Sequence, residues 1–334
     1  MAELKTVLII GVGSIGLRHL RCFQATRRAK LSICETDAAL RDKVAGQHPV
    51  ERAYAGLDEA LGDSHDAAVI ATPAHLHVPM ALRLAEAGVH LLIEKPLSTS
   101  LDGTEGLRAI LERRRLVAMV AYVLRAHPCL RSMREAIHAG RFGLPVQLVA
   151  CAGQHFPTYR PAYREIYYRD RATGGGAIQD ALTHLVNAGQ WLVGPVTRLV
   201  ADAAHQVLEG VEVEDTVHLL ARHGGVLASY SLNQHQAPNE FSITVVGKEG
   251  TARYEGHRSR WCWQLRPDEP WQEDVAAGLE RDDLFVEQAH RFLDAVEGRG
   301  EPSCTLDEGL HTLRCNLAAL ASAERGTWET VETR

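Results

Sequence analysis

Two acid–base residues four positions apart could carry out proton chemistry in this chain of 334 residues. They are Asp180 and His184, which follow the glycine run 174–176. Residues i and i+4 lie on the same face of an α-helix. A carboxylate there can orient an imidazole or tune its basicity, so the pair is suited to proton transfer. The glycine run predicts that the helix start lies close to a bound ligand.

Two other interpretations of this pair stay open on spacing alone. An Asp–His pair one turn apart is also a common ion pair on helix surfaces. A metal site is the third interpretation, but two ligands do not make a site, so we expect no metal.

A glycine loop forms the second chemical motif. Residues 11–16 read G-x-G-x-x-G, directly after the apolar run 6–10 and at the start of a helical pattern. Such a loop turns tightly, lets the backbone approach a pyrophosphate and packs the helix closely on the strand. N–H groups at the helix start then face the anion. The alternative is a loop whose glycines serve only the turn. The cofactor-binding residues expected here are Gly11, Gly13, Ser14, Ile15 and Gly16.

An acidic residue lies at the expected distance beyond this loop. Glu35 stands 35 − 16 = 19 residues after Gly16, at the end of a predicted strand over 31–34, and Asp37 is the second candidate. A carboxylate in this position accepts hydrogen bonds from the adenosine ribose. It also repels a 2′-phosphate, and no arginine follows immediately, so we expect NAD rather than NADP.

The third motif is Glu94-Lys95-Pro96, at the end of a predicted strand over 90–93. Ligands of open α/β sheets bind beyond the carboxyl ends of the strands, so we expect Lys95 to point toward the nicotinamide. Pro96 stiffens the turn that presents it. Taken alone, the tripeptide is equally an exposed Glu–Lys pair before a helix.

The order of these motifs resembles the Gfo/Idh/MocA family of oxidoreductases, which includes glucose–fructose oxidoreductase and inositol dehydrogenases. Similar stretches include Ala71–Ser98, Ala121–Pro128 and Val213–Arg222. The resemblance implies a Rossmann domain followed by an open-faced sheet domain, whose outer face mediates homodimers or homotetramers. It also implies that Lys95, Asp180 and His184 form the catalytic trio.

The same resemblance implies four further cofactor contacts around the ends of two strands. Two histidines, His75 and His77, also have a simpler interpretation as residues that begin a helix. The contacts implied are Thr72, Pro73, His77 and Glu94.

The substrate is less well specified. The family often has Asn at the position of Val123 and Phe at that of Ala126, so this chain departs from the pattern near the substrate. Tyrosines and arginines in the loop 159–168 suit polyhydroxylated or carboxylated ligands, because rings stack on sugars and guanidinium groups bind carboxylates. Packing between subunits is the alternative for this loop. The substrate candidates are Arg125, Tyr159, Arg160, Tyr163, Arg164 and Tyr167.

The elements that must position these residues change character along the chain. Short apolar runs alternate with helical patterns up to Tyr122, which predicts a doubly wound parallel sheet. Turn signals at 223–225 and 247–250 then predict hairpins and a mostly antiparallel sheet. We therefore predict an α/β Rossmann domain over 1–123 and an α+β domain over 124–334.

Composition excludes several function classes. The formal net charge is −6, which offers no field for a nucleic acid. No apolar run approaches the length of a membrane span, so we expect no membrane partner. The seven cysteines include no C-x-x-C pair and predict free thiols in the cytoplasm.

The sequence thus predicts an NAD-dependent dehydrogenase that oxidises or forms a secondary hydroxyl of a sugar, cyclitol or sugar derivative. One alternative is an NAD-retaining glycoside hydrolase or epimerase of the same family, which oxidises its substrate transiently. A non-enzymatic dinucleotide sensor is the other, and the Lys–Asp–His set argues against it.

Overall fold

The computed structural model describes residues 4–333 and divides them into two compact units. Unit 1 comprises residues 4–126 and 280–309, and unit 2 comprises residues 127–279 and 310–333. The division expected from the sequence assigns 280–309 to the second domain. In the structure, α9 (Arg281–Val296) buries Phe292 and Leu293 in the same core as β1. This helix therefore belongs to unit 1.

Unit 1 contains the predicted parallel sheet. Its strand order is β3-β2-β1-β4-β5-β6, and every neighbouring pair is parallel. From β1 the chain adds β2 and β3 on one side of the sheet and then returns to add β4, β5 and β6 on the other. Open α/β sheets bind ligands at such a switch point, here between β1 and β4. The strands are β1 (Lys5–Ile10), β2 (Ala29–Cys34), β3 (Ala53–Tyr54), β4 (Ala67–Ile70), β5 (His90–Ile93) and β6 (Ala118–Val120).

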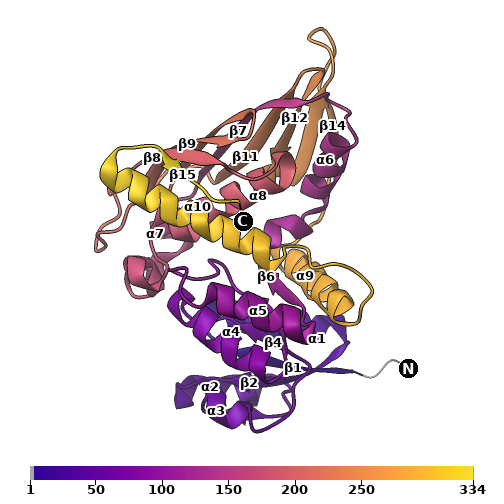
Figure 1. Ribbon diagram of the computed structural model, residues 1–334, viewed down its shortest axis with the longest axis vertical. Helices are drawn as coiled ribbons and strands as arrows, with labels where there is room; N and C mark the ends of the chain where they lie inside the picture. Colours follow the sequence, from indigo (N-terminus) through magenta and orange to yellow (C-terminus); the bar gives the residue numbers. More distant parts are fainter. Residues whose placement is uncertain (1–3, 334) are drawn as a thin grey trace. The chain divides into compact units, whose positions relative to one another are not determined.

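Helices connect these strands as the crossover rule requires. The helix α2 went unpredicted because its apolar residues show almost no helical periodicity and only Val44 is buried. The helices of unit 1, besides α9, are α1 (Ser14–Thr26), α2 (Ala38–Gln47), α3 (Leu57–Ala60), α4 (His77–Glu86) and α5 (Thr104–Arg114) (Figure 1).

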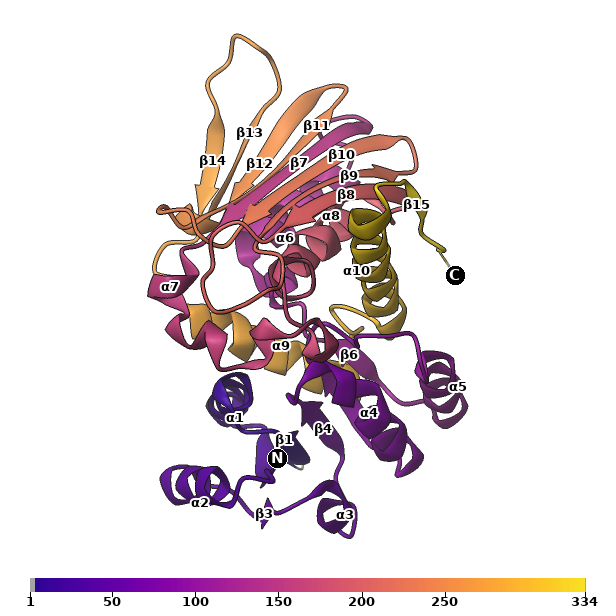
Figure 2. The same ribbon diagram turned by 90° about the vertical axis from the view of Figure 1, so that its left-hand side faces the viewer.

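Unit 2 is built on a nine-stranded sheet of order β14-β13-β12-β11-β7-β10-β9-β8-β15 (Figure 2). The two predicted hairpins are confirmed, between β9 and β10 and between β11 and β12. One central pair, β7 with β10, is parallel. The strands are β7 (Pro145–Gly153), β8 (Arg198–Ala204), β9 (Thr216–His223), β10 (Val226–Asn233), β11 (Glu240–Gly247), β12 (Gly250–Glu255), β13 (Arg260–Gln264), β14 (Gln272–Val275) and β15 (Glu329–Thr330).

One face of this sheet is covered by helices. Alternate residues of β9 are buried, beginning with Val217 and Leu219, as a half-buried strand requires. Hydrogen bonds between polar side chains join two of these helices: Asn187 donates to Thr312 at 2.9 Å, and Asn316 donates to Thr183 at 3.0 Å. The helices of unit 2 include α6 (Pro128–His138), α7 (Phe156–Tyr159), α8 (Thr183–Val193) and α10 (Leu306–Arg325), whose first four residues belong to unit 1.

Between β7 and α8 the chain forms a compact lobe, which we call the 156–173 lobe. It consists of α7 and the short helical turns Pro161–Arg164, Tyr167–Arg169 and Arg171–Thr173. Its side chains build a small core with the segment that precedes β9. The buried members are Phe156, Tyr163, Tyr168, Leu208, Val211 and Val213.

Candidate functional site

The glycine loop joins β1 to α1, and each of its three motif glycines has a distinct structural reason. Gly11 has φ +79°, and a Cβ there would lie 2.9 Å from the carbonyl oxygen of Ala71. A Cβ at Gly16 would lie 1.8 Å from the carbonyl oxygen of Gly11, so only glycine lets α1 pack this closely. Around Gly13, no atom of the described residues comes within 4 Å of a Cβ.

That open space lies at the start of a helix. Gly13 is the N-cap of α1, and Gly13 and Ser14 are both exposed, with Ile15 half-buried. The first N–H groups of a helix have no partners within it and favour anions. The loop therefore fits the pyrophosphate of a dinucleotide, as its sequence predicts.

Glu35 is fixed beside this loop. Its Oε2 accepts the backbone N–H of Val12 at 2.9 Å, and its Oε1 accepts the N–H of Asp37 at 3.1 Å. The Asp37 side chain itself caps α2 by accepting the N–H of Leu40. Asp37 is thus engaged in helix capping, and Glu35 is the carboxylate that the structure places against the glycine loop.

The loops after β4 and β5 contain the next group of predicted residues. Thr72 is half-buried and Pro73 is exposed at the end of β4. His77 begins α4 but is 1% exposed. One ring nitrogen, Nε2, lies 2.7 Å from the carbonyl oxygen of Thr72, and Nδ1 lies 3.0 Å from that of Pro96.

Glu94 lies beneath the surface beside a residue that the sequence did not single out. Its Oε1 lies 2.7 Å from Nε2 of His19 on α1, and both side chains are almost completely buried. Its Oε2 accepts the N–H of Lys95 at 3.0 Å. Burial raises the pKa of Glu94, but the His19 hydrogen bond and the nearby charges outweigh burial and lower it. Glu94 is therefore a buried carboxylate that holds the backbone of Lys95. The only sequence signal for His19 as the partner of Glu94 was its place in the helix that follows the glycine loop.

In unit 2, Asp180 and His184 lie at a change in helix type. Residues Ile178–Leu182 form a π-helical turn, in which the N–H of Thr183 reaches the carbonyl of Ile178, five residues back. The regular helix α8 then begins at Thr183. The expectation of a regular α-helix is therefore wrong for Ile178–Leu182. π turns of this kind occur often at functional sites.

The carboxylate of Asp180 is held by the 156–173 lobe. Its Oδ1 accepts a hydrogen bond from the Tyr167 hydroxyl at 2.6 Å, and its Oδ2 accepts one from Nη1 of Arg160 at 3.0 Å. The Asp180 side chain is 0% exposed, whereas that of Arg160 is 37% exposed. The charge of Asp180 raises the pKa of Arg160. Two residues predicted to contact substrate thus contact the predicted catalytic carboxylate.

The glycine run before this helix has a reason within the protein. A Cβ at Gly175 would lie 2.2 Å from the carbonyl oxygen of Tyr168. Gly176 has φ +86°, and its Cβ would lie 2.5 Å from Oε1 of Glu214. Glu214 is buried, accepts the N–H of Ile178 at 3.2 Å and pairs with Arg171 at 2.9 Å. These contacts require glycine at positions 175 and 176. The sequence did not single out Glu214, although it lies in the 213–222 stretch that resembles the family.

The remaining substrate candidates occupy different environments. Arg125 belongs to unit 1, where it is 2% exposed and bonds Glu308 at 2.6 Å and the carbonyl oxygen of Ser303 at 2.9 Å. These contacts give it a role in packing. Tyr163 is in the core of the 156–173 lobe. Arg164 donates to the Tyr163 hydroxyl at 3.0 Å, and Tyr159 is exposed.

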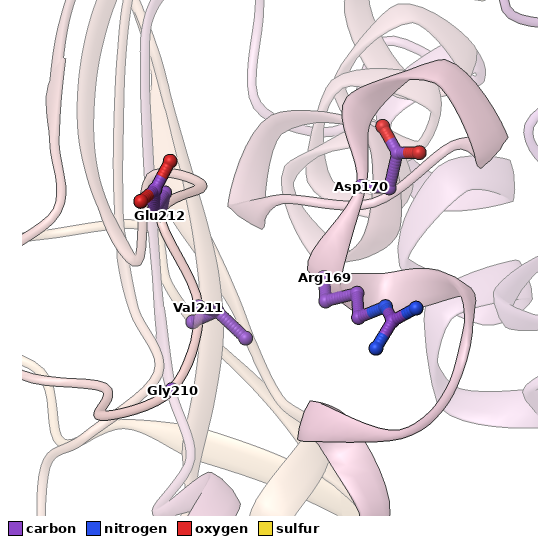
Figure 3. Close-up of a pocket in the computed structure, with 5 residues that line it drawn as sticks. All are labelled: Arg169, Asp170, Gly210, Val211 and Glu212. Atoms are coloured by element: carbon purple, nitrogen blue, oxygen red, sulfur yellow. The ribbon is translucent and has the colours of Figure 1, made fainter.

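One open pocket, of about 540 Å³, lies between this lobe and the segment that precedes β9. Figure 3 shows Asp170 and Arg169 on one side of it and Val211 and Glu212 on the other. The guanidinium of Arg169 points away from Val211 in this view. None of the residues lining this pocket belongs to the predicted site, and we do not assign it a ligand.

Other features bear on cofactors and location. Within residues 4–333, no group of three His, Cys, Asp or Glu side chains could hold a metal ion. No helix in the same range is long and apolar enough to cross a membrane. All seven cysteines are free, as predicted.

Two family models match successive parts of the chain. Residues 5–122 match an oxidoreductase family with an NAD-binding Rossmann fold. Residues 130–253 match the GFO/IDH/MocA C-terminal domain.

Individual relatives are similar over most of their length. A 1,5-anhydro-D-fructose reductase of Ensifer adhaerens is 26% identical and covers 97% of this chain and 98% of its own. An inositol 2-dehydrogenase of Corynebacterium glutamicum is 27% identical, covering 76% of this chain and 74% of its own. A solved levoglucosan dehydrogenase in complex with NADH superposes with a TM-score of 0.91 at 21% identity, covering 99% and 100% of the two chains. This last likeness concerns the fold.

Proposed function

Because the chain belongs to the Gfo/Idh/MocA family of oxidoreductases, we propose that it oxidises or forms a secondary hydroxyl of a sugar, cyclitol or sugar derivative. It is an NAD-dependent oxidoreductase with a Rossmann domain. The single observation that supports the cofactor site most directly is the exposed, uncrowded N-terminus of α1 at Gly13, with the Glu35 carboxylate fixed beside it.

Different residues of unit 1 would bind different parts of the cofactor. The N–H groups of Gly13, Ser14 and Ile15 would bind the pyrophosphate, because a helix start attracts negative charge. Glu35 would accept hydrogen bonds from the adenosine ribose. Thr72 and Pro73 would border the dinucleotide at the end of β4.

The chemical step needs a proton acceptor and a fixed positive charge. When bound, NAD would supply the acceptor for the hydride of the carbon that carries the hydroxyl. His184 takes the hydroxyl proton as a general base, which suits an imidazole near neutral pH. Lys95 stabilises the negative charge that develops on the oxygen. Asp180, held by Arg160 and Tyr167, is the positioning residue of this set.

The names of the relatives support the substrate class. Those proteins act on an anhydro-sugar, on inositol and on levoglucosan, each of which offers ring hydroxyls. Their identities to this chain lie between 24% and 27%, so we propose the class of substrate and no single compound.

The test is the appearance of NADH absorbance when the protein meets NAD and a panel of sugars, cyclitols and sugar acids. For a substrate found in this way, Lys95→Ala should lower kcat by about 10²–10³-fold, the effect of removing one electrostatic group from a reacting centre. Lys43→Ala, an exposed lysine on α2, is the matched control. Equal activity in Lys95→Ala would contradict the role of this lysine.

An NAD-retaining hydrolase or epimerase is the second candidate, since it would use the same residues with transient oxidation. It predicts cofactor that stays with the protein through purification, cleavage of activated glycosides and no net NADH. Net formation of NADH with any member of the panel would favour the dehydrogenase over the NAD-retaining enzyme.

We also propose that the chain forms a homodimer or homotetramer through the uncovered face of the unit 2 sheet. Leu220 on β9 and Leu227 on β10 are 53% and 52% exposed, and Leu220 lies opposite Val200 of β8. Exposed apolar side chains gathered on one sheet face commonly mark an interface. A second copy of the same face would cover them.

The free thiols support a cytoplasmic location. Six of the seven cysteines are buried, and burial raises the pKa of Cys22 and Cys34 to about 11, so these two remain thiols at neutral pH. Such cysteines are typical of a reducing compartment.

A further inference from the structure

A buried histidine connects the two loops that follow β4 and β5. His77 starts α4, yet its ring is turned inward and is 1% exposed. Its Nε2 lies 2.7 Å from the carbonyl oxygen of Thr72, and its Nδ1 lies 3.0 Å from that of Pro96. Carbonyl oxygens only accept hydrogen bonds. The ring must therefore be the donor in its hydrogen bond to either the Thr72 or the Pro96 carbonyl oxygen.

Both loops carry residues of the proposed site. Thr72 begins the segment expected to border the dinucleotide. Pro96 directly follows Lys95, so a hydrogen bond to the Pro96 carbonyl acts one residue from the lysine that the proposed chemistry requires.

A second buried contact holds the other side of the same lysine. Glu94 accepts the N–H of Lys95 at 3.0 Å and lies 2.7 Å from His19 of α1. The backbone on both sides of Lys95 therefore contacts buried polar side chains: Glu94, which is paired with His19 of α1, and His77 of α4.

Burial argues against a direct cofactor contact by His77, one of the two interpretations that the sequence left open. A ring that is 1% exposed, with both nitrogens within hydrogen-bond distance of backbone carbonyls, offers almost no surface to a cofactor. The exposed neighbour Pro73 and the half-buried Thr72 offer more.

We infer that His77 is a positioning residue that ties the loop after β4 to the loop after β5 and so fixes where Lys95 is presented. The part of this inference that concerns catalysis rests on the proposed function, and the part that concerns the loops does not.

The experiment compares His77→Phe, which keeps an aromatic ring but removes the N–H donor, with His77→Gln, which keeps an amide donor. The matched control is His311→Phe. His311 is a buried histidine of unit 2 whose nitrogens lie 3.1 Å and 3.0 Å from the carbonyl oxygens of Glu332 and Val196. Like His77, it is a buried ring between two carbonyl oxygens, but its partners are distant in sequence from the loops after β4 and β5.

Hydrogen–deuterium exchange of the purified chains is the first measurement, because it needs no substrate. In His77→Phe, exchange at the N–H groups of Leu76 and Lys95 should become about tenfold faster, the factor expected when a local hydrogen-bonded contact opens more readily. His311→Phe should leave these N–H groups unchanged, and His77→Gln should lie between His77→Phe and the wild type. Equal exchange in His77→Phe and His311→Phe would overturn the inference.

NADH binding and turnover supply the second measurement. Since the glycine loop and Glu35 are untouched, NADH affinity in His77→Phe should stay within about threefold of the wild type. With a substrate in hand, kcat should fall by about 10²-fold, as misplacement of a catalytic group by about 1 Å does. A loss of NADH affinity without faster exchange would make His77 a cofactor contact and overturn the inference. If no substrate is turned over, the proposed function fails while the exchange result still decides the role of His77.

Discussion

Asp180 illustrates how neighbours set the chemistry of one side chain. The sequence placed it one turn from His184 and suggested that the two act as a pair. In the structure its two oxygens accept hydrogen bonds from Tyr167 and Arg160, which the sequence had placed against the substrate. A buried carboxylate needs such partners, because an uncompensated buried charge is costly. Their identity depended on the fold of the 156–173 lobe, which no spacing rule describes.

Removing the cation should therefore reveal the cost of the buried carboxylate. Arg160→Gln should lower the free energy of unfolding by about 1–3 kcal/mol, a range reduced from that of a fully buried pair because Arg160 is 37% exposed. Adding Asp180→Asn to Arg160→Gln should recover part of this loss. Denaturant unfolding measures both, with the exposed Arg169→Gln as control. Strict additivity of the two single substitutions would refute the pairing.

Glu35 was predicted from a short, local motif, and its contact with the adenosine ribose stays a prediction. The structure adds that its carboxylate is anchored by the N–H groups of Val12 and Asp37. Its charge should repel the extra phosphate of NADPH. Glu35→Gln should raise the ratio of NADPH to NADH affinity by about tenfold, equivalent to ~1.4 kcal/mol.

Fluorescence titration with each reduced cofactor measures this ratio. The exposed Glu51→Gln is a suitable control in the same unit. An unchanged ratio in Glu35→Gln would mean that another residue selects the cofactor.

At the scale of elements, the segment before α8 departs most clearly from its sequence pattern. The helix was predicted, but the π turn Ile178–Leu182 was not. The glycine run was interpreted as room for a ligand, whereas Gly175 and Gly176 make room for Tyr168 and for the Glu214 carboxylate. Such reasons depend on the fold of the 156–173 lobe and on Glu214, which stands 214 − 176 = 38 residues after Gly176, so the local pattern does not reveal them.

Gly176→Ala should consequently be strongly destabilising. The substitution combines φ +86° with a Cβ 2.5 Å from Glu214, and we expect a loss of at least about 2 kcal/mol in the free energy of unfolding. Gly46→Ala on α2, where no described atom lies within 4 Å of the Cβ, should instead be neutral or stabilising by up to about 1 kcal/mol. Thermal or denaturant unfolding of the two variants makes the comparison, and equal stabilities would contradict this account of the glycine run.

At the scale of the whole molecule, the sequence predicted two domains, a parallel sheet and a mostly antiparallel sheet, and all of these are present. Strands alternating with helices, and hairpins with turn residues, are local signals. Two long-range features could not be predicted: the parallel pairing of β7 with β10, and the return of residues 280–309 to unit 1. Both join segments that are distant in the sequence, where no local pattern specifies the partner.

The uncovered sheet face gives a prediction at this scale. If the chain forms the proposed oligomer, Leu220→Glu combined with Leu227→Glu should convert it into a smaller species, because two carboxylates would then be buried against their copies across the interface. Light scattering after size-exclusion chromatography measures the mass. Leu265→Glu, at the end of β13 and 38% exposed, is the control. An unchanged mass in the double variant would exclude this face as the interface.

The central claim, that this chain is an NAD-dependent dehydrogenase of ring hydroxyls, is tested most directly by following NADH absorbance in the purified protein with added NAD and the panel of sugars, cyclitols and sugar acids. The account predicts steady accumulation of NADH with at least one class of compound, lost in Lys95→Ala and in His184→Ala. The account would be contradicted if the protein kept its cofactor bound, formed no net NADH with any member of the panel and cleaved activated glycosides.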